Sequence, residues 1–243
     1  TYFKKLGFEE KYILIDKNNH SGIAHIFVSK KGENSIAVAS GSNGTLTFEK
    51  IKPFLDEIAK ASIVLIQFEI PLDTILSIVN FCAKKGVKII VNPAPAIKLP
   101  KAILKKIWMI TPNETELELL TGLSVTNENS VLSAAKIILD QGVEHCLVTL
   151  GEKGSMWVNT EQCVRFKVPK QKTVDTTAAG DVFNGYLAYC LTNGFSLGEA
   201  IKLSHAAATI SVTFKGAQTS IPSIEKVQLF LEKHQISEDS IKL

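Results

Sequence analysis

Residues 173–185 constrain the fold more than any other part of the sequence, and they read Thr-Val-Asp-Thr-Thr-Ala-Ala-Gly-Asp-Val-Phe-Asn-Gly. Two acidic residues, Asp175 and Asp181, enclose a run of small side chains. Apolar residues at helical spacing follow directly, beginning with Phe183 and Leu187. The chain must therefore pass from a turn of small residues straight into a helix, with a carboxylate where the two join.

This junction has the properties of an anion-binding site. The first N–H groups of a helix have no partner within the helix, and they carry partial positive charge. The small side chains of Ala178, Ala179 and Gly180 would let a phosphate approach the backbone closely. Because a phosphate repels a carboxylate, Asp181 fits there best as a base that takes the proton of an attacking hydroxyl. The alternative is an ordinary acidic residue that complements the helix dipole.

The segment resembles the signature D-T-x-A/G-A-G-D-x-F of the ribokinase-like carbohydrate kinases. The matching residues are Asp175, Thr176, Ala179, Gly180, Asp181 and Phe183. The likeness continues through 205–208, which reads His-Ala-Ala-Ala, and through 215–222. The resemblance implies that Asp181 is the catalytic base and that the backbone from Ala178 to Gly180 forms an anion hole.

Composition excludes several other classes of protein. The chain has 243 residues, of which 45% are hydrophobic and 21% charged, as expected for one globular domain. The net charge is +3 without a basic block, so we expect no nucleic-acid partner. No apolar run is long enough to predict a membrane span. The four cysteines show no metal-binding spacing, and scattered thiols favour a reducing cytoplasm.

The pattern along the chain predicts a β-hairpin followed by alternating strands and helices. Segments 22–28 and 34–39 are predicted strands around a short loop, and 12–15 is a further predicted strand. Apolar runs then alternate with helical spacing, which is typical of a parallel sheet covered on both faces. The later predicted strands are 63–66, 87–91, 108–110 and 146–149, and predicted helices begin near 47, 71, 114 and 131.

We therefore expect an α/β fold, a three-layer, doubly wound, mostly parallel sheet of the ribokinase-like type with a small β lid. The lid region is assigned to residues 12–41, and residues 42–243 form the nucleotide-binding and catalytic part of a single domain. A lone hairpin is only marginally stable. It either packs on its own domain or, as the resemblance implies, pairs with the lid of a second subunit in a homodimer.

Polar segments follow four successive predicted strands. They are 67–69, 92–95, 111–116 and 149–154. Loops are polar in general, so one such segment means little. Ligands of parallel sheets bind at the carboxyl ends of the strands, where these four segments should meet. Together they predict a site at that edge.

The resemblance assigns roles within these segments. Glu69 falls where the family carries a sugar-contacting acid. Asn113 and Glu116 match the motif N-x-x-E, which is linked to phosphate and Mg²⁺, with Glu116 acting through water; a solvated helix carboxylate is the alternative. The nucleotide-binding turn T-L-G-x-x-G is matched by Thr149, Gly151 and Gly154, and a tight hairpin alone would also explain its glycines. His205 is placed near the adenine by resemblance, although a packed histidine is the default interpretation on an Ala-rich helix.

A monovalent cation site is also implied by the resemblance, usually for K⁺ and next to the anion hole. Its ligands would be mostly backbone carbonyls with one carboxylate, and oxygen ligands suit a hard cation. On this sequence they would be Asp175, Thr177, Ser211, Phe214, Gly216 and Ser220. The alternative for Asp175 is a turn residue.

Two sugar-binding segments of the family have no match in this chain. A complete member opens with an N-x-D segment on a strand, followed by G-G-K-G-A-N, and neither occurs here. The chain is therefore expected to be a fragment, a truncated gene product or the ordered remainder of a longer protein. The nucleotide-binding and catalytic motifs are all present.

The resemblance implies transfer of a phosphoryl group from ATP, with Mg²⁺, to the primary hydroxyl of D-ribose, giving ribose 5-phosphate. Two alternatives stay open: a kinase of the same family for another sugar or a nucleoside, and a non-catalytic nucleotide-binding protein. A nicotinamide-dependent dehydrogenase is disfavoured because no G-x-G-x-x-G follows an early strand.

Overall fold

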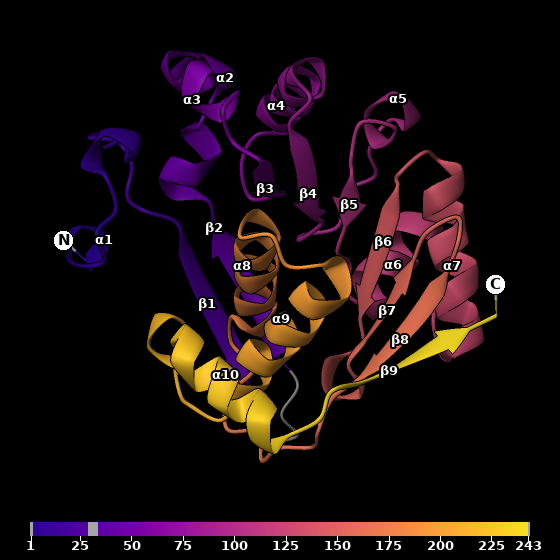
Figure 1. Ribbon diagram of the computed structural model, residues 1–243. Helices are drawn as coiled ribbons and strands as arrows, with labels where there is room; N and C mark the ends of the chain where they lie inside the picture. Colours follow the sequence, from indigo (N-terminus) through magenta and orange to yellow (C-terminus); the bar gives the residue numbers. More distant parts are fainter. Residues whose placement is uncertain (1, 29–33, 243) are drawn as a thin grey trace.

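The computed structural model describes residues 2–28 and 34–242, and it contains a two-stranded sheet and a seven-stranded sheet (Figure 1). The strands are β1 (Ile23–Val28), β2 (Asn34–Ala39), β3 (Ile63–Gln67), β4 (Lys88–Asn92), β5 (Met109–Ile110), β6 (His145–Thr149), β7 (Ser155–Val158), β8 (Cys163–Lys167) and β9 (Ser237–Ile241). The α-helices are α1 (Tyr2–Lys5), α2 (Phe48–Ile51), α3 (Leu55–Ile58), α4 (Leu72–Lys85), α5 (Lys101–Leu104), α6 (Glu114–Thr121), α7 (Glu128–Asp140), α8 (Ala179–Thr192), α9 (Leu197–Ser211) and α10 (Ile224–Lys233). Short 3₁₀ turns are η1 (Glu10–Tyr12), η2 (Gly41–Thr45), η3 (Lys52–Phe54), η4 (Gly151–Lys153) and η5 (Gln218–Ser220).

The large sheet is parallel in one half and antiparallel in the other. Its strand order is β3-β4-β5-β6-β7-β8-β9, and the first four strands are parallel to one another. Strands β7, β8 and β9 each run antiparallel to the strand before them. The parallel half agrees with the sequence prediction, whereas the antiparallel half was not predicted.

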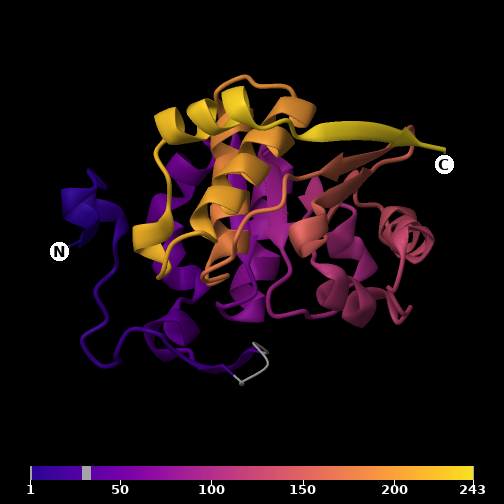
Figure 2. The same cartoon turned by 90° about the horizontal axis from the view of Figure 1, so that it is seen from below.

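Alternating apolar residues bury both faces of this sheet. On β4, Ile89 and Val91 belong to one hydrophobic cluster and Ile90 to the other. On β6, Val148 and Leu147 are divided in the same way. Helices α4, α6 and α7 complete the first cluster, and α8, α9 and α10 complete the second. In Figure 2 the orange and yellow C-terminal helices lie on one side of the sheet, as the predicted three-layer fold requires.

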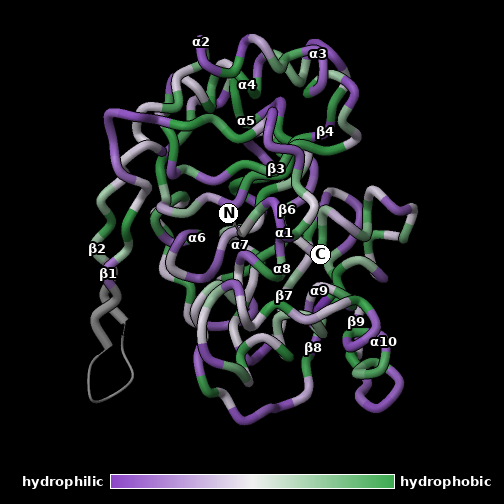
Figure 3. The backbone as a smooth tube through the Cα atoms, turned by 90° about the vertical axis from the view of Figure 1, so that its left-hand side faces the viewer, coloured by the Kyte–Doolittle hydropathy of each residue, from purple (hydrophilic) through white to green (hydrophobic). Residues whose placement is uncertain are grey.

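The hairpin prediction is confirmed for the described residues. Strands β1 and β2 pair antiparallel, with Ile23 opposite Ala39 and Ala24 opposite Val38. The predicted connecting loop, 29–33, lies outside the described residues. Figure 3 shows the hairpin projecting from the rest of the chain, and Ile23 and Val38 are exposed. The division of the chain at residue 41 stays a prediction.

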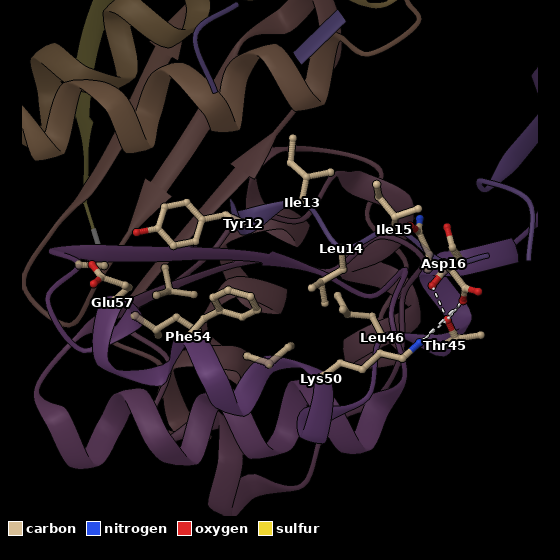
Figure 4. Close-up of a pocket in the computed structure, with 16 residues that line it drawn as sticks. Tyr12, Ile13, Leu14, Ile15, Asp16, Thr45, Leu46, Lys50, Phe54 and Glu57 are labelled. Atoms are coloured by element: carbon tan, nitrogen blue, oxygen red, sulfur yellow. Dashed lines mark hydrogen bonds and ion pairs between the residues drawn. The ribbon is translucent and has the colours of Figure 1, made fainter. Parts of the chain in front are cut away.

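The strand predicted at 12–15 is wrong. The residues from Ile13 to Asp16 form no regular element. Their apolar side chains line a cavity of about 1010 Å³ beside α2, η3 and α3, which Figure 4 shows. Thr45 donates a hydrogen bond to Asp16 at 2.7 Å and anchors the end of this segment. The apolar run thus lines a cavity beside neighbouring helices, with Ile13, Leu14 and Ile15 exposed, and it pairs with no strand among the described residues.

Candidate active site

The predicted junction of turn and helix is present at the start of α8. Helix α8 begins at Ala179, so Asp181 is its third residue. Ala178 precedes the helix with φ 61°, a left-handed conformation that costs a non-glycine residue about 1–2 kcal/mol. Among the described residues it is the only non-glycine residue with positive φ. A small side chain therefore stands where the chain turns most sharply before the helix.

The amides at this junction differ from one another in their hydrogen bonds. The N–H of Ala179 donates to the carbonyl of Thr176 at 3.2 Å. The prediction that the Ala179 amide contributes to the anion hole is therefore corrected, because this amide is already engaged. The N–H groups of Ala178, Gly180 and Asp181 have no hydrogen-bond partner within the described part of the chain. An anion would meet these three groups, with the positive end of the helix dipole behind them.

Asp181 is joined to the ends of three parallel strands by hydrogen bonds. Gln67 at the end of β3 donates through Nε2 to Oδ1 of Asp181 at 3.1 Å and to Oδ1 of Asn92 at 2.8 Å. Asn92 at the end of β4 donates to the carbonyl of Thr111 at 3.0 Å. The Thr111 hydroxyl donates to Asn184 at 2.7 Å, and Asn184 donates to the carbonyl of Gly180 at 2.9 Å. Asp181 itself is exposed, and it lines a cavity of about 560 Å³.

Asn113 and Glu116 form a capping box at the start of α6. The Asn113 side chain accepts from the Glu116 N–H at 2.8 Å, and Glu116 Oε2 accepts from the Asn113 N–H at 2.9 Å. Burial raises the pKa of Glu116, while the Asn113 N–H opposes this. Glu116 is thus not a freely solvated carboxylate. In this capping box only Oε2 is engaged. A role toward Mg²⁺ stays a prediction.

The predicted nucleotide-binding turn lies beside Asn113. The Thr149 N–H donates to the carbonyl of Pro112 at 2.9 Å, and Asn113 bridges Thr149 in parallel register. Gly151 and Gly154 have φ values of 55° and 99°. A Cβ on Gly154 would lie 2.1 Å from the carbonyl oxygen of Phe166, whereas one on Gly151 would meet nothing within 4 Å. Close packing therefore explains Gly154, and the open surface at Gly151 is available to a ligand.

A buried arginine supports this turn, and no motif or spacing in the sequence indicated it. Arg165 on β8 donates to the carbonyls of Lys153 at 2.7 Å and Ser155 at 2.9 Å, and also to that of Phe166. It pairs with Glu128 at 2.8 Å. A buried guanidinium must fill its donors in this way, because an unpaired buried charge is costly. Arg165 therefore holds this turn in place through its hydrogen bonds to the backbone.

His205 is a packed histidine in this structure. Its ring is buried, Nε2 is hydrogen-bonded to the Ser155 hydroxyl at 2.7 Å, and the ring contacts Phe183 with centroids 4.8 Å apart. Burial, with a smaller contribution from Arg165, lowers its pKa to about 3, so the ring is neutral at physiological pH. These contacts agree with the default interpretation from the sequence, a packed histidine. A contact of His205 with adenine stays a prediction.

The loops predicted to hold a monovalent cation are joined by Asp175. One carboxylate oxygen accepts from the Gly216 N–H at 2.9 Å and the other from the Thr177 N–H at 2.9 Å. These bonds, that of Gly216 first, lower the pKa of Asp175 to about 2. The Phe214 N–H donates to the carbonyl of Ser211 at 3.1 Å, and Ser220 is buried nearby in sequence. The donors are oxygen atoms with one ionised carboxylate, a set that fits a hard cation.

The remaining predicted residue, Glu69, is exposed two positions after Gln67. The structure thus brings Asp181 to the ends of β3, β4 and β5, and it brings Asn113 to Thr149. Four residues of the site had no individual role assigned from the sequence: Gln67, Asn92, Thr111 and Asn184. Three of these lie in the polar segments that follow the strands, which was the only signal for them.

Comparisons with known proteins agree with this arrangement. The family described as pfkB family carbohydrate kinase matches residues 1–224. A ribokinase of Haemophilus influenzae is 40% identical over 230 residues, covering 95% of this chain and 75% of that protein. A deoxyribokinase of Salmonella typhi is 36% identical, covering 88% and 71%. The structure of an Arabidopsis thaliana ribokinase complexed with ribose and ATP superposes with a TM-score of 0.82 at 32% identity, covering 88% and 70%.

The fold and the junction before α8 define a sugar kinase of the ribokinase-like class. The chain belongs to the pfkB family of carbohydrate kinases. Enzymes of this family use ATP with Mg²⁺. None of the helices within 2–28 and 34–242 is long and apolar enough to cross a membrane.

Proposed function

We propose that this protein is a ribokinase, which transfers the γ-phosphoryl group of ATP to the primary hydroxyl of D-ribose. The observation that carries the proposal is an exposed carboxylate, Asp181, at the ends of parallel strands and next to helix-start amides that have no hydrogen-bond partner in the described part of the chain. The similarity to ribokinases supports ribose as the acceptor. The similar identity to a deoxyribokinase makes 2-deoxyribose the competing acceptor.

In the proposed reaction Asp181 takes the proton of the acceptor hydroxyl as its oxygen attacks the γ-phosphorus and ADP leaves. The amides of Gly180 and Asp181, with that of Ala178, donate to the oxygens of the transferred group. The turn from Thr149 to Gly154 holds the nucleotide, and Glu69 contacts the sugar. The protein serves mainly to place these groups, because phosphoryl transfer needs little covalent help.

Two metal ions complete the proposal. Asn113 and Glu116 would organise Mg²⁺ through water, since the metal commonly keeps water ligands and takes one or two carboxylates plus phosphates. It would supply positive charge for the phosphate oxygens. Asp175 and the carbonyls of the cation loops would hold K⁺ beside the anion hole. The loop residues concerned are Thr177, Ser211, Phe214, Gly216 and Ser220.

The test of acceptor and cation is a panel assay. The complete protein is incubated with ATP, Mg²⁺ and each of D-ribose, 2-deoxy-D-ribose, fructose 6-phosphate and adenosine, in KCl or in NaCl. We expect the highest kcat/KM for D-ribose and faster turnover in KCl. A preference for 2-deoxyribose or another acceptor would replace ribose in the proposal, and no turnover of any acceptor would favour the non-catalytic alternative.

We also propose a homodimer formed through the hairpin. Support comes from the exposed apolar residues Ile23 and Val38 on paired strands that project from the domain. Val38→Asp would bury a charge in such an interface, so it should convert a dimer into a monomer in sedimentation velocity. The exposed Val174→Asp, on the loop before α8 and outside the hairpin strands, serves as the control. A wild-type monomer at micromolar concentration would contradict the proposal.

A further inference from the structure

Hydrogen bonds at the strand ends form a continuous circuit, and both of its ends lie in the first turn of α8. It runs from Asp181 to Gln67, through Asn92 and Thr111, to Asn184 and back to the carbonyl of Gly180. Asn92, Thr111 and Asn184 are buried, and Gln67 is half-buried beneath the exposed Asp181. Within the described residues, no buried side-chain nitrogen or oxygen lacks a partner.

Backbone carbonyls fix the direction of every bond in this circuit. The amide of Asn92 must turn its Nδ2 toward the carbonyl of Thr111, because a carbonyl can only accept. Its Oδ1 therefore faces Gln67, so Gln67 must donate through Nε2. The second proton on that nitrogen is then directed at Asp181. A flipped Gln67 amide would place its oxygen against two acceptors, which is unfavourable.

The circuit fixes the orientation of the Asp181 carboxylate. Gln67 occupies Oδ1, and Oδ2 has no partner among the described residues. An exposed aspartate without such a contact would sample several rotamers. A base acts efficiently only when it lies within hydrogen-bond reach of the proton it removes. The circuit thus selects one orientation of the carboxylate and leaves one oxygen free for an incoming hydroxyl.

We propose that Gln67, held in orientation by Asn92, is a positioning residue that holds Asp181 ready to accept the proton of the acceptor hydroxyl. This inference rests on the proposed function of Asp181. Both hydrogen bonds of Gln67 Nε2 are directed at Asn92 and Asp181, so Gln67 acts through Asp181. Its effect should therefore appear in kcat and leave nucleotide binding largely unchanged.

The first test is the pair Gln67→Met and Gln67→Glu. Methionine keeps the length without a donor, and we expect kcat to fall about 10- to 100-fold, the effect of losing a hydrogen bond to a charged group. Glutamate places a second carboxylate against Asp181, so kcat should fall further than in the methionine variant. The KM for ATP should stay within about twofold, and the melting temperature should fall by only a few degrees, because the buried Oδ1 of Asn92 loses its donor. Gln162→Met, on an exposed loop, is the matched control.

A second readout does not depend on turnover. In ¹H–¹⁵N spectra the Nε2 resonances of Gln67 should shift in Asp181→Ala, whereas those of Gln162 should not. No shift at Gln67, or wild-type kcat in Gln67→Met, would overturn this inference and leave the proposed function standing. A wild-type protein that phosphorylates no acceptor would instead overturn the proposed function, and the spectra would still report whether Gln67 holds Asp181.

Discussion

Asp181→Asn is expected to lower kcat for sugar phosphorylation by about 10²- to 10⁴-fold, which corresponds to about 3–5 kcal/mol of transition-state stabilisation. The substitution keeps the size of the side chain, and asparagine Oδ1 can still accept from Gln67. It removes the basic oxygen that would receive the proton. Nucleotide affinity, measured by calorimetry, should change little, because the substitution leaves untouched the helix-start amides that are proposed to bind the phosphate.

The matched control for this variant is Asp73→Asn. Asp73 is also an exposed acidic residue in the first turn of a 14-residue helix, α4, so its loss has a similar effect on the helix dipole. We expect kcat close to that of the wild type. Near-normal turnover of Asp181→Asn would reject its role as a base and return it to the alternative of an ordinary helix-start carboxylate.

Gly154→Ala is expected to lower the free energy of unfolding by about 3–6 kcal/mol, because two costs combine. Its φ of 99° is unfavourable for any residue with a side chain, and the new Cβ would lie 2.1 Å from the carbonyl oxygen of Phe166. Backbone cannot yield as a flexible side chain can. In a chain of this size the melting temperature should fall by roughly 10 °C or more.

Gly151→Ala separates conformational strain from packing in the same turn. Gly151 also has positive φ, but its Cβ would enter open space, so we expect a loss of only about 1 kcal/mol. Thermal unfolding of both variants measures the difference. Equal stability of the two would contradict the close approach of Gly154 to β8.

The parts of the fold that the sequence predicted are those with a strong local signal. Apolar runs located β3, β4, β5 and β6, and the helix predicted to begin near 71 is observed as α4, with Gly86 in the left-handed region at its end. The junction at Asp181 was predicted because small residues and helical spacing adjoin in sequence. Parallel strands then bring the polar segments after them to one edge, which needs no further information.

The parts that could not be predicted depend on contacts between distant residues. Gln67 and Asp181 are 114 positions apart, and an isolated glutamine after a strand has many roles. Arg165 resembles any basic residue on a strand until its three carbonyl partners are known. The apolar run at 12–15 has strand composition, but its side chains line a cavity beside helices. The bond from Ala179 to Thr176 depends on the exact turn geometry, so the sequence could not show which amides before α8 are already engaged.

The most direct test of the central claim is a crystal structure of the complete protein with D-ribose and a non-hydrolysable ATP analogue. The account predicts Oδ2 of Asp181 about 2.6–3.2 Å from the primary hydroxyl of the sugar, Oδ1 still bonded to Gln67, and the amides of Gly180 and Asp181 directed at the γ-phosphate. A sugar bound away from Asp181, or a γ-phosphate that does not approach the start of α8, would contradict it.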